Sequence, residues 1–159
     1  MGGVTATLAV TSDDFADGGG LPATFAGGQA GCPGDNVNPQ LSWSPGPAGT
    51  TSYVIALVDP DARNYSHWLH VDIPPNVVGV ARGASASLPG TTGRGTNGTS
   101  AYFGPCPPSR HHYVFTVYAL KTDRLELPPD ATAALAGFMI NANALGKASF
   151  TALYGRPAQ

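Results

Sequence analysis

The sequence has few charged residues and no concentration of basic ones. Asp, Glu, Lys and Arg make up 11% of its 159 residues, against roughly 25% in a typical globular domain. The eight Lys and Arg residues are scattered singly and form no run. Nucleic-acid binding needs a concentrated basic face and membrane-surface binding a polybasic segment, so both are disfavoured. Any anion must be bound by local hydrogen-bond donors rather than by the field of the whole molecule.

Long apolar runs are also missing. No run approaches the roughly 18 residues that a transmembrane segment needs. The first residues lack the basic start and apolar centre of a signal peptide. As the sequence stands we expect a cytoplasmic protein without a transmembrane segment, and a secreted form whose signal was removed stays open. A nucleophile elbow, a P-loop and an HExxH motif are absent as well, which lowers the expectation of an enzyme.

Turn-forming residues and short strands dominate what is present. The sequence has 21 glycines and 15 prolines without a repeat period, which is typical of many turns between strands. Ser52–Asp59 is an almost continuous apolar run and predicts a central strand that is covered on both faces. Further strands are predicted over Leu41–Trp43, Trp68–Ile73, His112–Leu120 and Ala148–Tyr154. The expected fold class is therefore mainly β, in a single domain spanning 1–159.

One helix is predicted late in the chain. Pro128-Pro129-Asp130 opens it with Asp130 as the N-cap, and Gly146 is a natural C-cap. Apolar residues at helical spacing form one stripe, which we expect to pack against the core. The stripe consists of Leu135, Phe138, Met139, Ala142 and Leu145.

All four histidines lie in two short stretches, each at the edge of a predicted strand beside a Pro/Gly turn. Binding residues tend to collect at such places. Because side chains alternate along a strand, adjacent residues point to opposite faces. His67 and His111 are thereby the expected pair at one site, with His70 and His112 elsewhere.

Several motifs, in this order and spacing, resemble the phosphatidylethanolamine-binding protein family. They are DPDA at 59–62, HW at 67–68, GPCPP at 104–108 and HHY at 111–113, with NPQLSW and TTSYVIALVDPD upstream and LGKASFTALYG near the end. The likeness runs from about Gly20 to Gly155 and is closest to the compact prokaryotic-type members. It implies a large central antiparallel sheet packed against a smaller sheet and a few short helices. It also implies a shallow pocket at one end for a phosphate, a phosphorylated head group or a simple carboxylate.

The resemblance to the family implies a set of pocket residues in this sequence. They are Asp59, His67, Gly104, Cys106, Pro107, His111 and Tyr113. Chemically, the two histidines and the tyrosine can donate hydrogen bonds to an anion, and the backbone N–H of Cys106 is a further expected donor. The Asp59 carboxylate would orient a histidine, or meet the ammonium group of an ethanolamine.

Other interpretations of the same residues remain open at this point. Asp59, His67 and His111 are proper zinc ligands, and Cys106 near His111 suggests a thiol nucleophile. The resemblance implies neither a metal nor another cofactor. Whether Cys32 and Cys106 form a disulfide is left open, because reduced cysteines are the norm in the cytosol.

The leading functional hypothesis is a non-catalytic binding protein for phospholipid head groups or other small anions. A second is an inhibitor of a protein partner, a kinase or a protease, since the family name is linked to both kinds of inhibition. Such a partner would contact the pocket rim, where the loop Arg82–Ser100 and Arg63 are expected. The third is an acid–base enzyme that uses the same pocket.

Overall fold

Two antiparallel sheets form the framework of the protein in the computed structural model, which describes residues 8–28 and 32–155. The larger sheet has the strand order β6-β4-β3-β7-β8 and the smaller one β1-β2-β5. The larger sheet consists of β3 (Ser52–Asp59), β4 (Tyr65–Ile73), β6 (Thr91–Thr92), β7 (His111–Leu120) and β8 (Ala144–Tyr154). The smaller sheet consists of β1 (Val10–Thr11), β2 (Leu41–Trp43) and β5 (Gly79–Val80).

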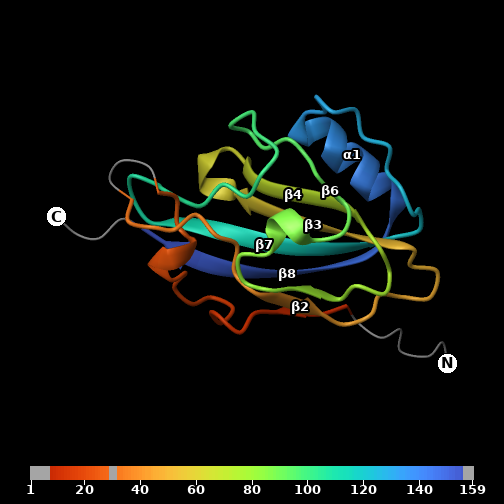
Figure 1. Ribbon diagram of the computed structural model, residues 1–159, viewed down its shortest axis with the longest axis horizontal. Helices are drawn as coiled ribbons and strands as arrows, with labels where there is room; N and C mark the ends of the chain where they lie inside the picture. The colour runs from red at the N-terminus through yellow and green to blue at the C-terminus, as the bar shows by residue number, and fades with distance from the viewer. Residues whose placement is uncertain (1–7, 29–31, 156–159) are drawn as a thin grey trace.

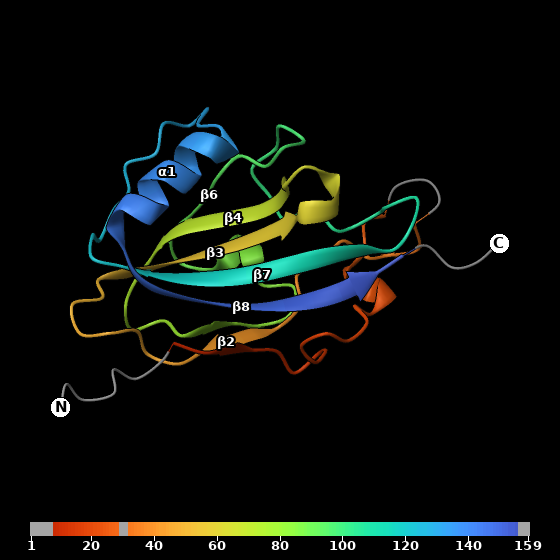
Figure 2. The ribbon, with the colours of Figure 1, turned by 180° about the vertical axis from the view of Figure 1, so that it is seen from behind.

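Helical elements are short. The one α-helix is α1 (Ala133–Asn143), and three 3₁₀ turns are η1 (Ala23–Phe25), η2 (Pro60–Ala62) and η3 (Ser85–Ser87), counted over the described residues. The larger sheet lies between the smaller sheet and α1 (Figures 1 and 2). None of the helices in the described ranges is long and apolar enough to cross a membrane. The predicted mainly-β architecture is confirmed.

Each face of the larger sheet has its own apolar core. The bigger core lies between the two sheets and includes Leu57, Trp68 and Phe115. A smaller core beneath α1 includes Val54, Leu69 and Ile140. Because side chains alternate along β3, its odd-numbered residues enter the first core and its even-numbered ones face α1. The central position predicted for this strand is confirmed, since β3 pairs with both β4 and β7.

The boundaries of the helix differ from the prediction. Thr132, not Asp130, is the N-cap, and its hydroxyl accepts a hydrogen bond from the N–H of Leu135 at 3.1 Å. The helix ends at Asn143 and passes directly into β8 at Ala144, so Gly146 lies inside a strand rather than at a C-cap. The pairing between β7 and β8 extends back to Ala144. This pairing makes β8 longer than the apolar run from which the sequence predicted it.

The predicted buried stripe on the helix is wrong except at Met139, which packs partly buried against the smaller core. Phe138 is 74% exposed and Leu135 is 41% exposed, while Ala136 and Ile140 are buried. Nearly every position of α1 is apolar, so helical spacing alone cannot select the buried face. Ala136 and Ile140 lie against the sheet, which leaves Leu135 and Phe138 on the solvent side.

The difference in exposure predicts that substitutions on the two faces of α1 change the free energy of unfolding by different amounts. Phe138→Gln should change the free energy of unfolding by less than about 0.5 kcal/mol, as for other surface substitutions. Ile140→Ala should lower it by about 2–5 kcal/mol, because it removes buried methylene groups and leaves a cavity. Urea unfolding of both variants measures the difference. Equal losses would mean that the exposed stripe is packed after all.

Candidate functional site

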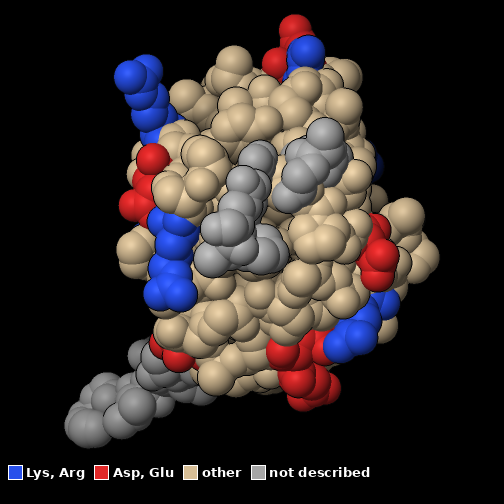
Figure 3. Space-filling view, turned by 90° about the vertical axis from the view of Figure 1, so that its left-hand side faces the viewer, with Lys and Arg blue, Asp and Glu red and all other residues tan. Residues whose placement is uncertain are grey.

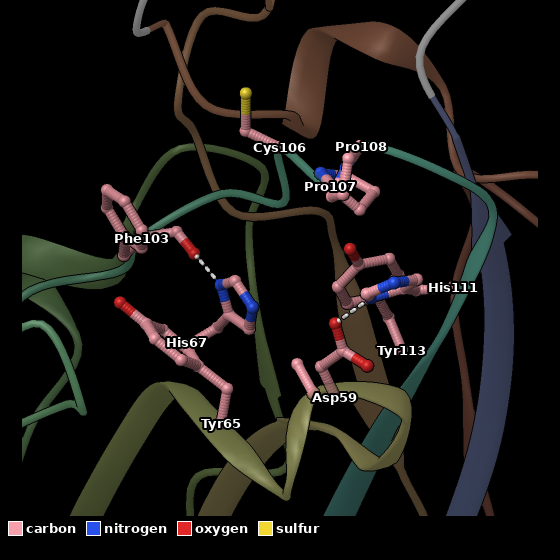
Figure 4. Close-up of a pocket in the computed structure, with 10 residues that line it drawn as sticks. Asp59, Tyr65, His67, Phe103, Cys106, Pro107, Pro108, His111 and Tyr113 are labelled. Atoms are coloured by element: carbon pink, nitrogen blue, oxygen red, sulfur yellow. Dashed lines mark hydrogen bonds and ion pairs between the residues drawn. The ribbon is translucent and has the colours of Figure 1, made fainter.

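A cavity of about 250 Å³ opens at the end of the larger sheet where β3 finishes and β7 begins. Figure 4 shows two imidazoles on opposite sides of it, with the Asp59 carboxylate below and the segment that carries Cys106 above. Six of the seven carried-over residues line it, and Gly104 does not. The lining residues are Asp59, Ala62, Tyr65, His67, Phe103, Cys106, Pro107, Pro108, His111 and Tyr113.

The Asp59 carboxylate anchors one side of the cavity. It is only 2% exposed, and a buried charge needs hydrogen-bonded partners. One carboxylate oxygen accepts from the N–H of Asp61 at 2.9 Å, which caps the η2 turn, and the other lies 2.6 Å from Nδ1 of His111. The carboxylate accepts, so Nδ1 of His111 carries the proton and Nε2 is the ring nitrogen left for a ligand.

His67 reaches the cavity through a bulge in β4. Leu57 pairs with Trp68 and the next residue of β3 pairs with Ser66, so His67 is the extra residue of the bulge. Bulges re-aim a side chain in this way. Nδ1 of His67 lies 2.7 Å from the carbonyl oxygen of Phe103, which can only accept. Nε2 of His67 is therefore also the nitrogen left for a ligand.

Burial sets the charge of His67. Its pKa is lowered by burial, and the Phe103 carbonyl and the Asp59 charge only partly oppose this effect. The imidazole is consequently neutral at neutral pH, and its Nε2 carries a lone pair. The expectation that both histidines offer an N–H to an anion therefore holds only for their protonated forms, because each Nδ1–H is already used within the protein.

Tyr113 supports the site from β7. The side chain is 1% exposed. Burial raises the pKa of its phenol, and the negative charge of nearby Asp59 raises the pKa further. The phenol therefore stays protonated at physiological pH and keeps the O–H that the sequence suggested as a donor.

The wall above the histidines is tied to the N-terminal part of the chain. Cys106 forms a disulfide with Cys32, with the two Cα atoms 5.8 Å apart. The Pro105 carbonyl accepts from the N–H of Gly27 at 2.9 Å. Because the sulfur of Cys106 is in this bond, it is not the thiolate that a nucleophile would need.

Gly104 has a packing role instead of a lining role. A Cβ at this position would lie 2.5 Å from the backbone carbonyl oxygen of Phe25, so only glycine allows the two segments to approach. Its N–H donates to the side-chain oxygen of Asn36 at 2.7 Å. The residue thus positions the cavity wall without lining the cavity itself.

The remaining histidines lie away from the cavity. His70 is buried between Thr92 and the Pro89 carbonyl, at 2.9 and 3.1 Å from its two ring nitrogens. His112 contacts the Asp61 carboxylate at 2.7 Å on the surface. Tyr65 and Phe103 line the cavity but were missed by the sequence reasoning. Strand alternation places Tyr65 on the face of His67 and could have found it.

The metal interpretation finds no support. Across residues 8–28 and 32–155, no three His, Cys, Asp or Glu side chains are grouped so that they could hold a metal ion. Figure 3 views the end of the molecule at which the cavity lies, and charged side chains of both signs are scattered around it without a continuous patch of either. Local groups therefore have to supply the attraction for any charged ligand.

Residues 11–155 match the family model described as phosphatidylethanolamine-binding protein. The chain belongs to the phosphatidylethanolamine-binding protein family. It is 37% identical to the UPF0098 protein YbcL of Escherichia coli (strain K12), over 94% of this chain and 88% of the relative. It is 39% identical to the Putative lipoprotein LppC of Mycobacterium tuberculosis (strain ATCC 25618 / H37Rv), over 89% of this chain and 69% of the relative.

Solved structures agree with this assignment. The crystal structure of Escherichia coli YbcL, described as a member of the mammalian PEBP family, superimposes with a TM-score of 0.88 at 34% identity. It covers 94% of this chain and 99% of that one. A homologue from Chlamydia trachomatis superimposes with a TM-score of 0.82 at 28% identity, over 93% of this chain and 97% of its own.

The disulfide should contribute measurably to stability. Its cysteines are 74 residues apart in the sequence, and breaking it should lower the free energy of unfolding by about 2–5 kcal/mol. Urea unfolding with and without dithiothreitol measures this effect. The Cys32→Ser/Cys106→Ser variant is the matched control, because its midpoint should not respond to the reductant. An unchanged midpoint for the reduced wild-type chain would contradict the prediction.

Proposed function

We propose that this protein binds a phosphate, a phosphorylated head group such as that of phosphatidylethanolamine, or a similar small anion between His67 and His111. The observation that carries the proposal is the hydrogen-bonding arrangement that the two imidazoles have in common. Each uses Nδ1–H on an acceptor of the protein and leaves Nε2 for the cavity. When protonated, both Nε2–H groups donate charge-assisted hydrogen bonds, which are the strong ones for an anion.

Binding must then be coupled to proton uptake. With unprotonated histidines the cavity presents two lone pairs beside the Asp59 carboxylate, which repels an anion. Each proton that binds converts an acceptor into a positively charged donor. An anion in turn favours the charged form of its neighbours and raises the low pKa of His67. The site thus takes up its ligand and its protons together.

An ammonium group would find its place on the aromatic side of the cavity. Asp59 is not free for it, because the carboxylate is 2% exposed and bonded to His111 and to the Asp61 amide. Tyr65 and Phe103 lie 4.8 and 5.8 Å from the His67 ring, measured between centroids. Aromatic faces attract cations, so phosphoethanolamine fits with its phosphate on the imidazoles and its amine beside these rings.

The disulfide bears on where the protein works. Stable disulfides belong to oxidising compartments, and the relative LppC is named a lipoprotein. The Cys32–Cys106 bond therefore favours an oxidising compartment over the cytoplasm that the first residues suggested. A head-group binder in such a compartment would meet phospholipids at the outer surface of a membrane.

Proton coupling predicts that affinity falls as pH rises. Titration calorimetry with sulfate between pH 5.5 and 8.5 should show binding that weakens as the pH rises, by up to about tenfold per pH unit for each proton that is taken up with the ligand. Sulfate keeps its charge over this range, so the change reports on the protein. Phosphoethanolamine, whose second pKa is about 6, is the second ligand.

Two asparagine variants isolate the site. His111→Asn keeps a donor for Asp59 but removes Nε2, and should abolish most sulfate binding. His112→Asn changes the adjacent surface histidine and should leave binding as it is. Affinity that is flat across the pH range, or unchanged in His111→Asn, would contradict the proposed function.

A further inference from the structure

A second cavity, of about 430 Å³, lies between the larger sheet and α1. It is on the opposite face of the sheet from the first cavity. Asp59 of β3 enters the first cavity, whereas Ala56 and Val58, which alternate with it, line the second. The two cavities are separate, although the turn after β3 borders both.

Small side chains leave this space open. Ala133, Ala136 and Gly137 of α1 face Ala56 of the sheet across it. A Cβ on Gly137 would meet nothing within 4 Å. Ala56 and Val58 stay partly exposed although β3 is the central strand of the sheet. The helix thus covers the sheet incompletely and leaves an apolar groove.

One end of the groove is polar. Ser66 is 5% exposed and lies across from Val58 in the strand pairing, so its side chain shares the face that lines the groove. Its hydroxyl makes none of the side-chain hydrogen bonds of the described ranges and lines the groove, where it can donate to a ligand.

A cation lies at the same end. Arg63 was expected at the rim of the first cavity, but it lines the second. Its backbone is left-handed, with φ of 56°, which turns the chain toward the helix side. Among the ion pairs of the described residues none involves Arg63. The groove therefore combines an apolar body with one unpaired positive charge at its end.

We propose that this groove binds a single-chain amphiphile with an anionic head, the head at Arg63 and Ser66 and the acyl chain between α1 and the sheet. Apolar walls with a few convergent polar groups are the usual construction of a small-molecule site. A sugar or a nucleotide would leave its polar groups without partners along the walls. A fatty carboxylate or an alkyl phosphate matches both ends of the groove.

Calorimetric titration with hexanoate, octanoate and decanoate, kept below their micellar concentrations, tests the chain. Affinity should rise about fourfold for each added methylene until the groove is filled. Decan-1-ol should bind about two- to fivefold more weakly than decanoate, because it lacks the charge for Arg63. Decyl phosphate, titrated alongside, distinguishes a phosphate head from a carboxylate head.

Two variants locate the ligand. Gly137→Leu fills the groove and replaces a weak helix former with a strong one, so it should fold stably and bind decanoate at least tenfold more weakly. Ala142→Leu, on the exposed side of the same helix, is its matched control and should bind as wild type. Arg63→Asn suits the left-handed backbone and should weaken decanoate binding about two- to fivefold but leave decan-1-ol binding unchanged.

The outcomes separate this proposal from the one for the first cavity. Decanoate binding that survives in His111→Asn and fails in Gly137→Leu supports the groove. Binding that fails in His111→Asn and survives in Gly137→Leu would place the ligand in the first cavity and overturn the proposal. A wild-type chain that binds none of these amphiphiles would overturn it as well, whatever the result with sulfate.

Discussion

The buried carboxylate of Asp59 is the constraint on which the first cavity depends. A charge so far from water is tolerated only with donors around it, and here they come from the Asp61 amide and His111. These contacts shape the turn after β3 and join β3 to the start of β7. They also decide which nitrogen of His111 is free. One desolvated charge thereby sets both the local backbone and the chemistry that a ligand meets.

The alternation of side chains along β3 separates two cavities on opposite faces of the larger sheet. Its odd-numbered residues lead through the large core to Asp59, while Ala56 and Val58 face the space beneath α1. A central strand normally has both faces covered. Here the short helix with small residues covers one face only in part. The same strand thus ends at a polar cavity on one side and borders an apolar groove on the other.

The segment from Tyr102 to Pro108 acts as a firm wall because many separate contacts hold it. The Tyr102 hydroxyl donates to the Phe25 carbonyl at 2.7 Å, Gly104 packs against the same backbone, and Cys106 is bonded to Cys32. Prolines on both sides of Cys106 restrict the backbone further. A ligand at the histidines therefore meets a wall that is ordered beforehand, which reduces the conformational entropy lost on binding.

Local patterns in the sequence were enough for β2, β3 and β7, for the second parts of β4 and β8, and for the mainly-β fold, but not for the two-residue strands β1, β5 and β6. They also placed His67 and His111 at one site, and both line the first cavity. Strand periodicity, turn residues and motif spacing depend on neighbours along the chain, so they can be read without coordinates. The buried face of α1 could not be predicted, because Phe138 and Ile140 are equally apolar and only the sheet beneath them distinguishes the two. The bulge at His67, the hydrogen-bonding state of both histidines and the packing role of Gly104 were likewise decided by tertiary contacts. Each of these depends on atoms that lie far away in the sequence and meet only in the folded chain.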